Sequence, residues 1–99
     1  ELKVDGEIQA DLALDRDKLR ENFPFSCLDE AANVLIFPSL AAGNAAYKVL
    51  EALGGATAIG PILLGLPKPI TVLPRDATVE TIVHMTAYTV SKAQEQLSG

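Results

Sequence analysis

The sequence is poor in cysteine, histidine and aromatic residues. Its 99 residues include one Cys, one His and no Trp, and Phe and Tyr together make up 5% of the chain. A single cysteine excludes an intramolecular disulfide, and one Cys with one His is too few for a zinc site of the usual ligand count. This cysteine usage indicates a reducing, cytoplasmic compartment.

Long apolar runs and basic clusters are missing as well. No run approaches the roughly 20 residues that span a bilayer, and no basic stretch followed by an apolar one opens the chain. Eight Lys and Arg are scattered among thirteen Asp and Glu, which gives a net charge of −5. Because nucleic-acid binding needs a clustered basic face, we expect neither a nucleic-acid partner nor a membrane.

What the sequence does have is ordinary globular composition, with 48% hydrophobic and 21% charged residues. This composition predicts a single domain region over residues 1–99. The chain begins ELKVDGEIQ, without an initiator methionine and with apolar and polar residues already alternating. We therefore interpret it as a piece of a longer polypeptide.

The first half of the chain predicts two strands and two helices. Apolar and polar residues alternate from Val4 to Leu14, which is typical of a half-buried strand. The stretch LDRDKLRENF predicts a short solvated helix ended by Pro24. Asn33 to Phe37 predicts a buried strand. A helix follows, with Ser39 as its cap and Gly54-Gly55 as its stop.

The second half continues the alternation. Residues 56–66 are apolar but broken by glycines and a proline, which predicts one short buried strand and a loop. Residues 70–73 predict a last strand, and Thr78 is the expected cap of a helix over 79–97. Alternating strands and helices predict an α/β fold, a three-layer sheet with flanking helices.

Arg75 is the leading candidate for a binding residue. It lies in the stretch KPITVLPRDATVETIV, in a turn just before the N-terminus of the predicted last helix. Unpaired backbone N–H groups at a helix N-terminus favour an anion, and a guanidinium adds a bidentate clamp for phosphate or carboxylate. The alternative is a local ion pair of Arg75 with Asp76 or Glu80, in a turn that merely caps the helix.

The acidic residues Asp5, Glu7 and Asp11 lie on one face of the predicted first strand, and carboxylates are ligands for divalent cations. An exposed acidic strand face is the favoured interpretation, since such faces are common in a chain of this charge and no second cluster of ligands appears in the sequence.

Four other side chains carry weaker signals. His84 falls in the middle of the last predicted helix without a neighbouring nucleophile, and Cys27 has no adjacent basic residue to activate it. We interpret His84 as a partly buried helix residue and Cys27 as inert packing. Tyr47 and Lys48 are placed to reach a ligand, but a tyrosine at helical spacing is more often core or rim.

Three segments in order resemble the phosphate acetyl/butyryltransferases: VDGEIQADLAL, NVLIFPSLAAGNAAYK and IGPILLGLPKPITVLPRDATVETIV. Together they cover most of the chain. The finer resemblance is to the transferase-like C-terminal domain of hybrid NADP-dependent malic enzymes. It implies the two-lobed fold of the isocitrate and isopropylmalate dehydrogenases, of which this chain is a fragment. It also implies that acyl-CoA and acyl phosphate meet between the lobes.

The resemblance also implies site residues. Active members read Ser-Arg-Gly at this turn, with an acidic residue five positions beyond the glycine. The serine is thought to stabilise the transition state, the arginine to hold phosphate, and the aspartate to deprotonate the CoA thiol. In this chain Pro74, Arg75, Asp76 and Thr81 stand at these four positions, so that only the arginine is kept.

The two exchanges weigh against catalysis. Pro74 has neither hydroxyl nor N–H, and the hydroxyl of Thr81 is too weak a base for a thiol. Loss of a base costs on the order of 10²–10⁴ in rate, and loss of a transition-state donor about 10²–10³. We therefore expect no catalytic residue in this chain, Arg75 as its anion-binding residue, and no metal or cofactor bound by it.

The leading hypothesis from the resemblance is a regulatory and oligomerising domain of an NADP-dependent malic enzyme that senses acetyl-CoA or a related acyl-CoA. NADP and a divalent metal are then expected in the N-terminal part of the parent chain. The alternative is part of an active phosphate acetyltransferase, moving an acetyl group between CoA and phosphate. A third reading is a purely structural interface. The expected partners are an acyl-CoA, the rest of its own polypeptide and further copies of the same chain.

Overall fold

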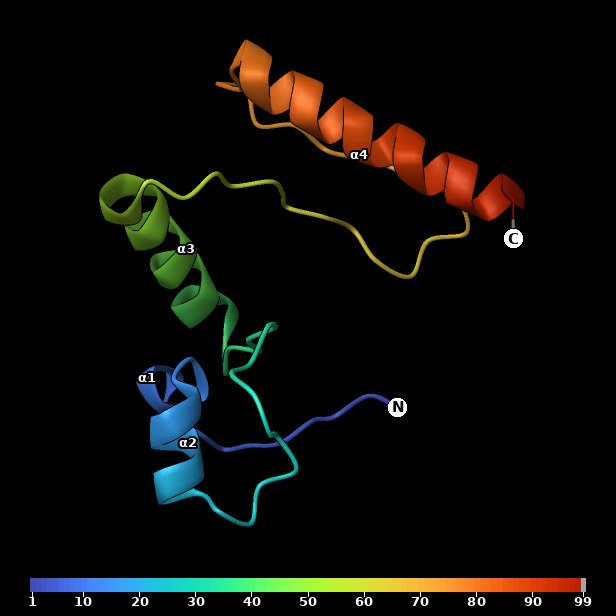
Figure 1. The fold of residues 1–99 in the computed structure, drawn as a ribbon. Helices are drawn as coiled ribbons and strands as arrows, with labels where there is room; N and C mark the ends of the chain where they lie inside the picture. Colours follow the sequence, from blue (N-terminus) through green and yellow to red (C-terminus); the bar gives the residue numbers. More distant parts are fainter. Residues whose placement is uncertain (99) are drawn as a thin grey trace. The chain divides into compact units, whose positions relative to one another are not determined.

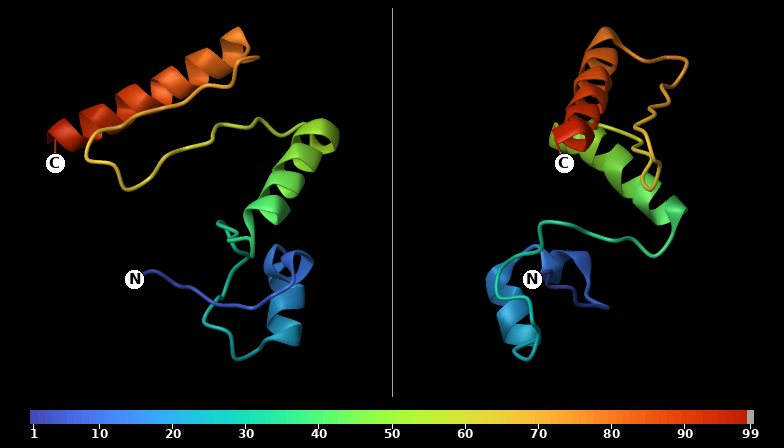
Figure 2. Two further views of the ribbon diagram at one scale, coloured as in Figure 1. Left: turned by 180° about the vertical axis from the view of Figure 1, so that it is seen from behind. Right: turned by 90° about the vertical axis from the view of Figure 1, so that its right-hand side faces the viewer.

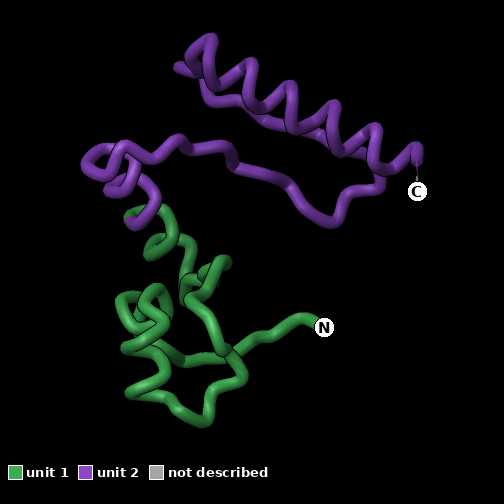
Figure 3. The backbone as a smooth tube through the Cα atoms, viewed as in Figure 1, with its two compact units in different colours: residues 1–45 green, residues 46–99 purple. Residues whose placement is uncertain are grey.

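The computed structural model describes residues 1–98, and these contain four helices (Figure 1). They are α1 (Ala10–Ala13), α2 (Arg16–Asn22), α3 (Leu40–Gly54) and α4 (Val79–Ser98). The chain divides into two compact units, residues 1–45 and 46–99, and α3 runs across the division (Figure 3). Within residues 1–98, no helix is both long and apolar enough to cross a membrane.

Unit 1 is built on the contact between α1 and α2. Leu19 of α2 is fully buried, and Ala13 of α1 is 6% exposed. Asp15 caps α2, because its carboxylate accepts hydrogen bonds from the backbone N–H groups of Asp17 and Lys18. The helix predicted from LDRDKLRENF is thus confirmed.

The strand predicted from Val4 to Leu14 is wrong. Residues 10–13 form α1, and residues 1–9 carry no paired strand. The physical reason lies in the side chains: Leu12 and Ala13 turn toward the unit interior while Asp11 and Leu14 stay exposed, which suits one turn of helix. Apolar and polar residues do alternate in this stretch, but the alternation does not reflect an extended backbone.

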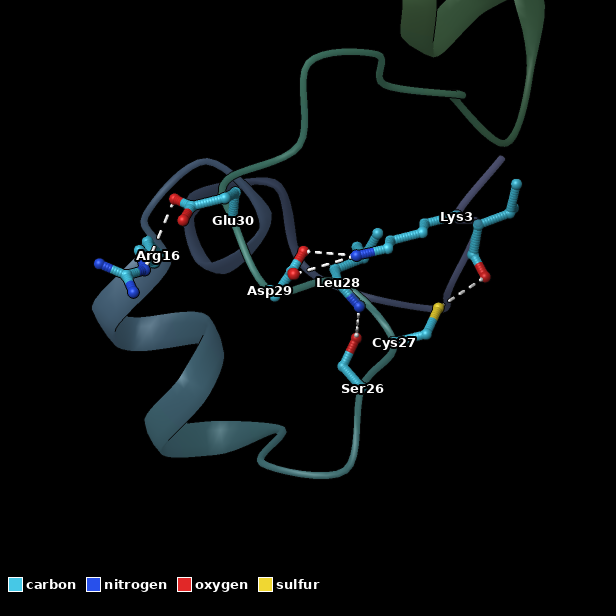
Figure 4. A network of polar contacts seen from close by, with 8 residues as sticks. Lys3, Arg16, Ser26, Cys27, Leu28, Asp29 and Glu30 are labelled. Atoms are coloured by element: carbon cyan, nitrogen blue, oxygen red, sulfur yellow. Dashed lines mark hydrogen bonds and ion pairs between the residues drawn. The ribbon is translucent and has the colours of Figure 1, made fainter. Parts of the chain in front are cut away.

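A polar network joins the N-terminal segment of unit 1 to the loop after α2 (Figure 4). The Lys3 ammonium donates to both carboxylate oxygens of Asp29, at 2.9 and 3.0 Å. Ser26 donates its hydroxyl proton to Asp5 at 2.6 Å, and the Cys27 thiol donates to the carbonyl of Val4 at 3.3 Å. These contacts link segments more than twenty residues apart in sequence, so they hold the loop of unit 1 in place.

The two long helices are confirmed with their caps. Ser39 accepts a hydrogen bond from the Ala42 N–H at the start of α3, and Gly55 follows α3 with φ of 67°. That left-handed conformation is easy for glycine, and it ends the helix. At α4, Thr78 accepts from the Thr81 N–H at 3.1 Å.

In unit 2, the chain before α4 runs back along that helix (Figures 1 and 2). The hydroxyls of Thr71 and Thr89 are hydrogen bonded, which fixes this arrangement at its middle. Among the described residues of unit 2, Met85 of α4 is the buried apolar side chain, at 2% exposure. Unit 2 thus consists mainly of α4 and the extended segment that runs alongside it.

Residues 33–37, 56–66 and 70–73 were the other predicted strands. None of these residues lies in a paired strand in the described part of the chain. A strand is stabilised by hydrogen bonds to a neighbouring strand, and none is supplied within residues 1–98. The three-layer α/β sheet thus stays a prediction.

Candidate functional site

The turn that holds Arg75 is a four-residue turn from Pro74 to Ala77. The Ala77 N–H donates to the Pro74 carbonyl at 3.1 Å, and Arg75 and Asp76 occupy the two central positions. Pro74 brings no N–H to this turn, but its carbonyl is the acceptor that closes it. Both central side chains are exposed. The turn therefore presents one cation and one anion to solvent.

The N-terminus of α4 follows this turn directly. Thr78 satisfies the Thr81 N–H, and the Thr81 hydroxyl lies 3.0 Å from the Thr78 hydroxyl. Thr81 is thereby part of the helix cap. Within the described residues, the N–H groups of Val79 and Glu80 have no protein partner. Two donors at the positive end of a 20-residue helix are thus left beside the turn.

Arg75 forms no ion pair or hydrogen bond with any other described residue. The alternative of a local pair with Asp76 or Glu80 is therefore not what the structure contains. The guanidinium is available to an external anion, with Asp76 as a neighbouring negative charge that opposes it. A guanidinium can hold the oxygens of an anion through its N–H donors, so the arrangement suits binding better than proton transfer.

The acidic trio does not come together. Asp5 accepts hydrogen bonds from Ser26 and from the Gly6 N–H, while Asp11 belongs to α1. Among residues 1–98, no group of three His, Cys, Asp or Glu is arranged to hold a metal ion. The hydrogen bond from Ser26, helped by that from Gly6, lowers the pKa of Asp5 below its ordinary value of 3.8.

The weaker candidates are divided between the units: Cys27 belongs to unit 1, and the other three belong to unit 2. Cys27 is exposed, so the interpretation as inert packing is wrong: its thiol lies on the surface of unit 1. His84 is half-buried in α4, as expected. Tyr47 is 43% exposed, and the Lys48 ammonium lies 5.2 Å from the centre of its ring. These two neighbours on α3 contact each other.

Sequence reasoning missed a hollow of about 180 Å³ in unit 2, between residues 62–71 and α4. Its α4 side is formed by Tyr88, Lys92 and Gln96. Lys92 is already paired with Glu95 at 2.9 Å, which raises the pKa of Lys92 above its usual value. The hollow is smaller than the roughly 300–1,000 Å³ of most ligand pockets. Its one sequence signal was the apolar run from 62 to 66.

Comparison with protein-family models matches residues 1–90 to the phosphate acetyl/butaryl transferase family. The chain belongs to this family. The matched range includes the turn at Arg75 and the start of α4. The family resemblance inferred from the three sequence segments is confirmed.

Relatives in this transferase family include phosphate acetyltransferases. The enzyme of Paracoccus denitrificans is 48% identical over 93 residues, covering 94% of this chain and 29% of its own length. An NADP-dependent malic enzyme of Haemophilus influenzae is 39% identical over 95 residues, covering 96% of this chain and 13% of its own length. The chain thus spans less than a third of either relative.

A solved structure supports the same family. The EutD phosphotransacetylase from Staphylococcus aureus superposes with a TM-score of 0.81 at 39% sequence identity. The superposition covers 90% of this chain and 27% of that protein. The local arrangement described above therefore has a counterpart in a transferase.

Proposed function

We propose that this chain is the phosphate-binding part of a phosphate acetyltransferase that moves an acetyl group between CoA and phosphate. The observation that carries the proposal is Arg75, an exposed arginine without a protein partner in the described residues, next to free N–H groups of α4. Family membership and the phosphate acetyltransferases among its relatives support the choice of anion.

In the proposed reaction the CoA thiolate sulfur attacks the acetyl carbon of acetyl phosphate. A C–S bond forms, the C–O bond to phosphate breaks, and phosphate leaves with the electron pair. Arg75 binds the phosphoryl oxygens before the transfer and stabilises the leaving phosphate afterwards. Thr81 is no base for the thiol, and Pro74 is no hydroxyl donor, so proton removal falls to groups outside this chain.

A second candidate is the regulatory domain of an NADP-dependent malic enzyme that senses acetyl-CoA. Two observations favour it: the Haemophilus influenzae relative is a malic enzyme, and Pro74 and Thr81 replace the reactive residues that the family resemblance implies. In this role Arg75 binds a phosphate of acetyl-CoA without turnover. Regulation then requires that acetyl-CoA bind two states of the parent enzyme with different affinity.

The test of phosphate binding uses the 99-residue chain. Acetyl phosphate or inorganic phosphate is titrated while the amide NMR signals of residues 75–81 are followed. We expect saturable shifts in the unaltered chain. Arg75→Ala should lower the affinity for phosphate about 10-fold or more, since hydrogen bonds to charged groups are worth about 1.5–3 kcal/mol. Arg20→Ala removes an equal charge from unit 1 and is the matched control. Equal weakening by both variants would mean nonspecific charge attraction.

The test of turnover places this chain in the matched region of the Paracoccus denitrificans enzyme. Acetyl-CoA formation from acetyl phosphate and CoA is measured with and without Arg75→Ala. Turnover that falls in the variant supports the transferase. Phosphate binding without turnover, together with a saturable response to acetyl-CoA when the chain is placed in the Haemophilus malic enzyme, supports the regulatory domain. Absence of binding in every protein contradicts both roles.

A further inference from the structure

The hollow in unit 2 lies where residues 62–71 run alongside α4 (Figures 1 and 2). One of its walls is apolar and includes Ile62 and Leu66, each of which is less than half exposed. The other wall is a single stripe of α4, formed by residues four apart in sequence: Tyr88, Lys92 and Gln96. The hollow thus combines an apolar wall with a polar one inside one unit.

The charge of this hollow is opposite to that of the whole chain. Two of the eight basic residues line it, Lys68 and Lys92, and none of the thirteen acidic residues does. Among residues 1–98, Lys68 forms no ion pair. Lys92 donates to Glu95, but a lysine ammonium has further N–H donors. The hollow is therefore an anion-attracting place in a chain whose net charge is −5.

The volume of the hollow limits the size of an occupant. A cavity of about 150 Å³ holds benzene, which has about six heavy atoms, and this hollow measures about 180 Å³. An occupant of that size needs an apolar part that contacts Ile62 and Leu66. It also needs a negative charge for the lysines. A single negative charge matches best, because Glu95 already offsets part of the charge of Lys92.

We propose that this hollow binds a short-chain monocarboxylate of up to about four carbons. The carboxylate accepts hydrogen bonds from the ammonium groups of Lys68 and Lys92, and the alkyl chain lies against Ile62 and Leu66. The hydrogen bond between Thr71, which lines the hollow, and Thr89 of α4 joins the two walls. Arg75 does not line the hollow, so the proposal does not rest on phosphate binding at the turn.

Titration of the 99-residue chain with sodium butyrate tests the proposal. The NMR signals of the Tyr88 ring and of the amides of residues 62–71 are followed at constant ionic strength, kept with sodium chloride. We expect saturable shifts. Butyrate should bind about 10-fold more tightly than acetate, because each buried CH₂ group contributes roughly 4-fold.

Two pairs of variants separate the roles of the two walls. Lys68→Gln should weaken butyrate binding about 10-fold or more, whereas Lys48→Gln, an equal charge change on exposed α3, should change it less than about 2-fold. Leu66→Ala should reduce the preference for butyrate over acetate. Leu97→Ala, at an exposed site outside the hollow, should keep that preference.

Three results would overturn the proposal. Shifts that do not saturate, or equal weakening by Lys68→Gln and Lys48→Gln, would mean nonspecific charge attraction. Equally tight binding of butyramide would show that the lysines do not select the ligand. Tighter binding of inorganic phosphate, seen in the same signals, would assign the hollow to another anion. Arg75→Ala should leave butyrate binding unchanged, so a failure here is distinguishable from a failure of phosphate binding at residues 75–81.

Discussion

Thr71 and Thr89 are hydrogen bonded through their hydroxyls across 18 residues of sequence. Thr89 donates its single proton to the Met85 carbonyl at 2.7 Å, so Thr71 must be the donor to Thr89. This chain of two bonds runs from the extended segment into the backbone of α4. It lies beside Met85, the buried apolar residue of unit 2.

We expect Thr71→Val to loosen the extended segment from α4. The substitution keeps the shape but removes the donor, and a hydrogen bond of this kind contributes about 0.5–1.5 kcal/mol. Thr71→Ser keeps the hydroxyl and should restore most of the loss. Urea unfolding of the two variants measures the difference, each carrying Tyr47→Phe so that the tyrosine fluorescence comes from Tyr88 on α4. Equal stability of the Val and Ser variants would show that the bond contributes nothing.

Leu19→Ala should unfold unit 1. Leu19 of α2 is fully buried, and truncation of a buried leucine to alanine costs about 2–5 kcal/mol. A unit whose other buried apolar side chain is Ala13 has little to compensate. Leu14→Ala, at a site that is 55% exposed, is the control and should cost much less. Unfolding of unit 1 should speed the amide exchange of α2. Unchanged exchange in Leu19→Ala would contradict the prediction.

The contact between Asp5 and Ser26 should depend on pH. Hydrogen bonding holds the folded pKa of Asp5 below its ordinary value of 3.8, so the charged carboxylate is favoured in the fold. Its contribution to stability is full above the ordinary pKa and is lost as the pH falls through the folded pKa. Asp29 behaves likewise, because the Lys3 ammonium lowers its pKa.

Ser26→Ala tests this contact directly. Without the hydroxyl donor, the pKa of Asp5 should move up toward 3.8 while that of Asp29 stays lowered by Lys3. Carboxyl-carbon NMR titrations of both residues give the two values separately. Ser91→Ala, on the exposed surface of α4, is the control. If the pKa of Asp5 were unchanged in Ser26→Ala, the Ser26 hydroxyl would not be the cause of its lowered value.

Thr78→Ala should fray the start of α4 and, with it, the site at Arg75. The variant leaves the Thr81 N–H without its acceptor, and loss of such a cap costs about 0.5–2 kcal/mol. Faster exchange of the Thr81 amide and weaker phosphate binding are the expected readouts. Thr78→Ser keeps the acceptor and should retain both. Thr86→Ala, on the exposed face of α4, should change neither.

Local signals in the sequence predicted α2, α3 and α4, whereas α1 was predicted as part of a strand. Ser39 and Thr78 are both caps, and the left-handed Gly55 follows α3, because a cap or stop depends on residues a few positions apart. Strand predictions depend on partners far away, and none of the predicted strands is paired within residues 1–98. The stretch at Val4 failed for a further reason: Ile8 and Leu12 are four residues apart, which is also a helical spacing, and residues 10–13 form α1.

The candidate site was predicted in part. Its place between a turn and a helix N-terminus could be inferred from proline, arginine and the capping threonine. The absence of a pair between Arg75 and Glu80 in the described residues depends on side-chain directions, which residue spacing does not fix. The role of Thr81 as a partner of the cap likewise required coordinates.

The small number of buried apolar residues also has a calorimetric consequence. Within residues 1–98 the buried apolar side chains are Ala13, Leu19 and Met85. The heat capacity of unfolding comes largely from newly hydrated apolar surface, so it should fall well below the usual value of about 12–15 cal/mol/K per residue. A small heat capacity and a small enthalpy give broad thermal transitions. The folded fraction of this chain should therefore change only gradually with temperature.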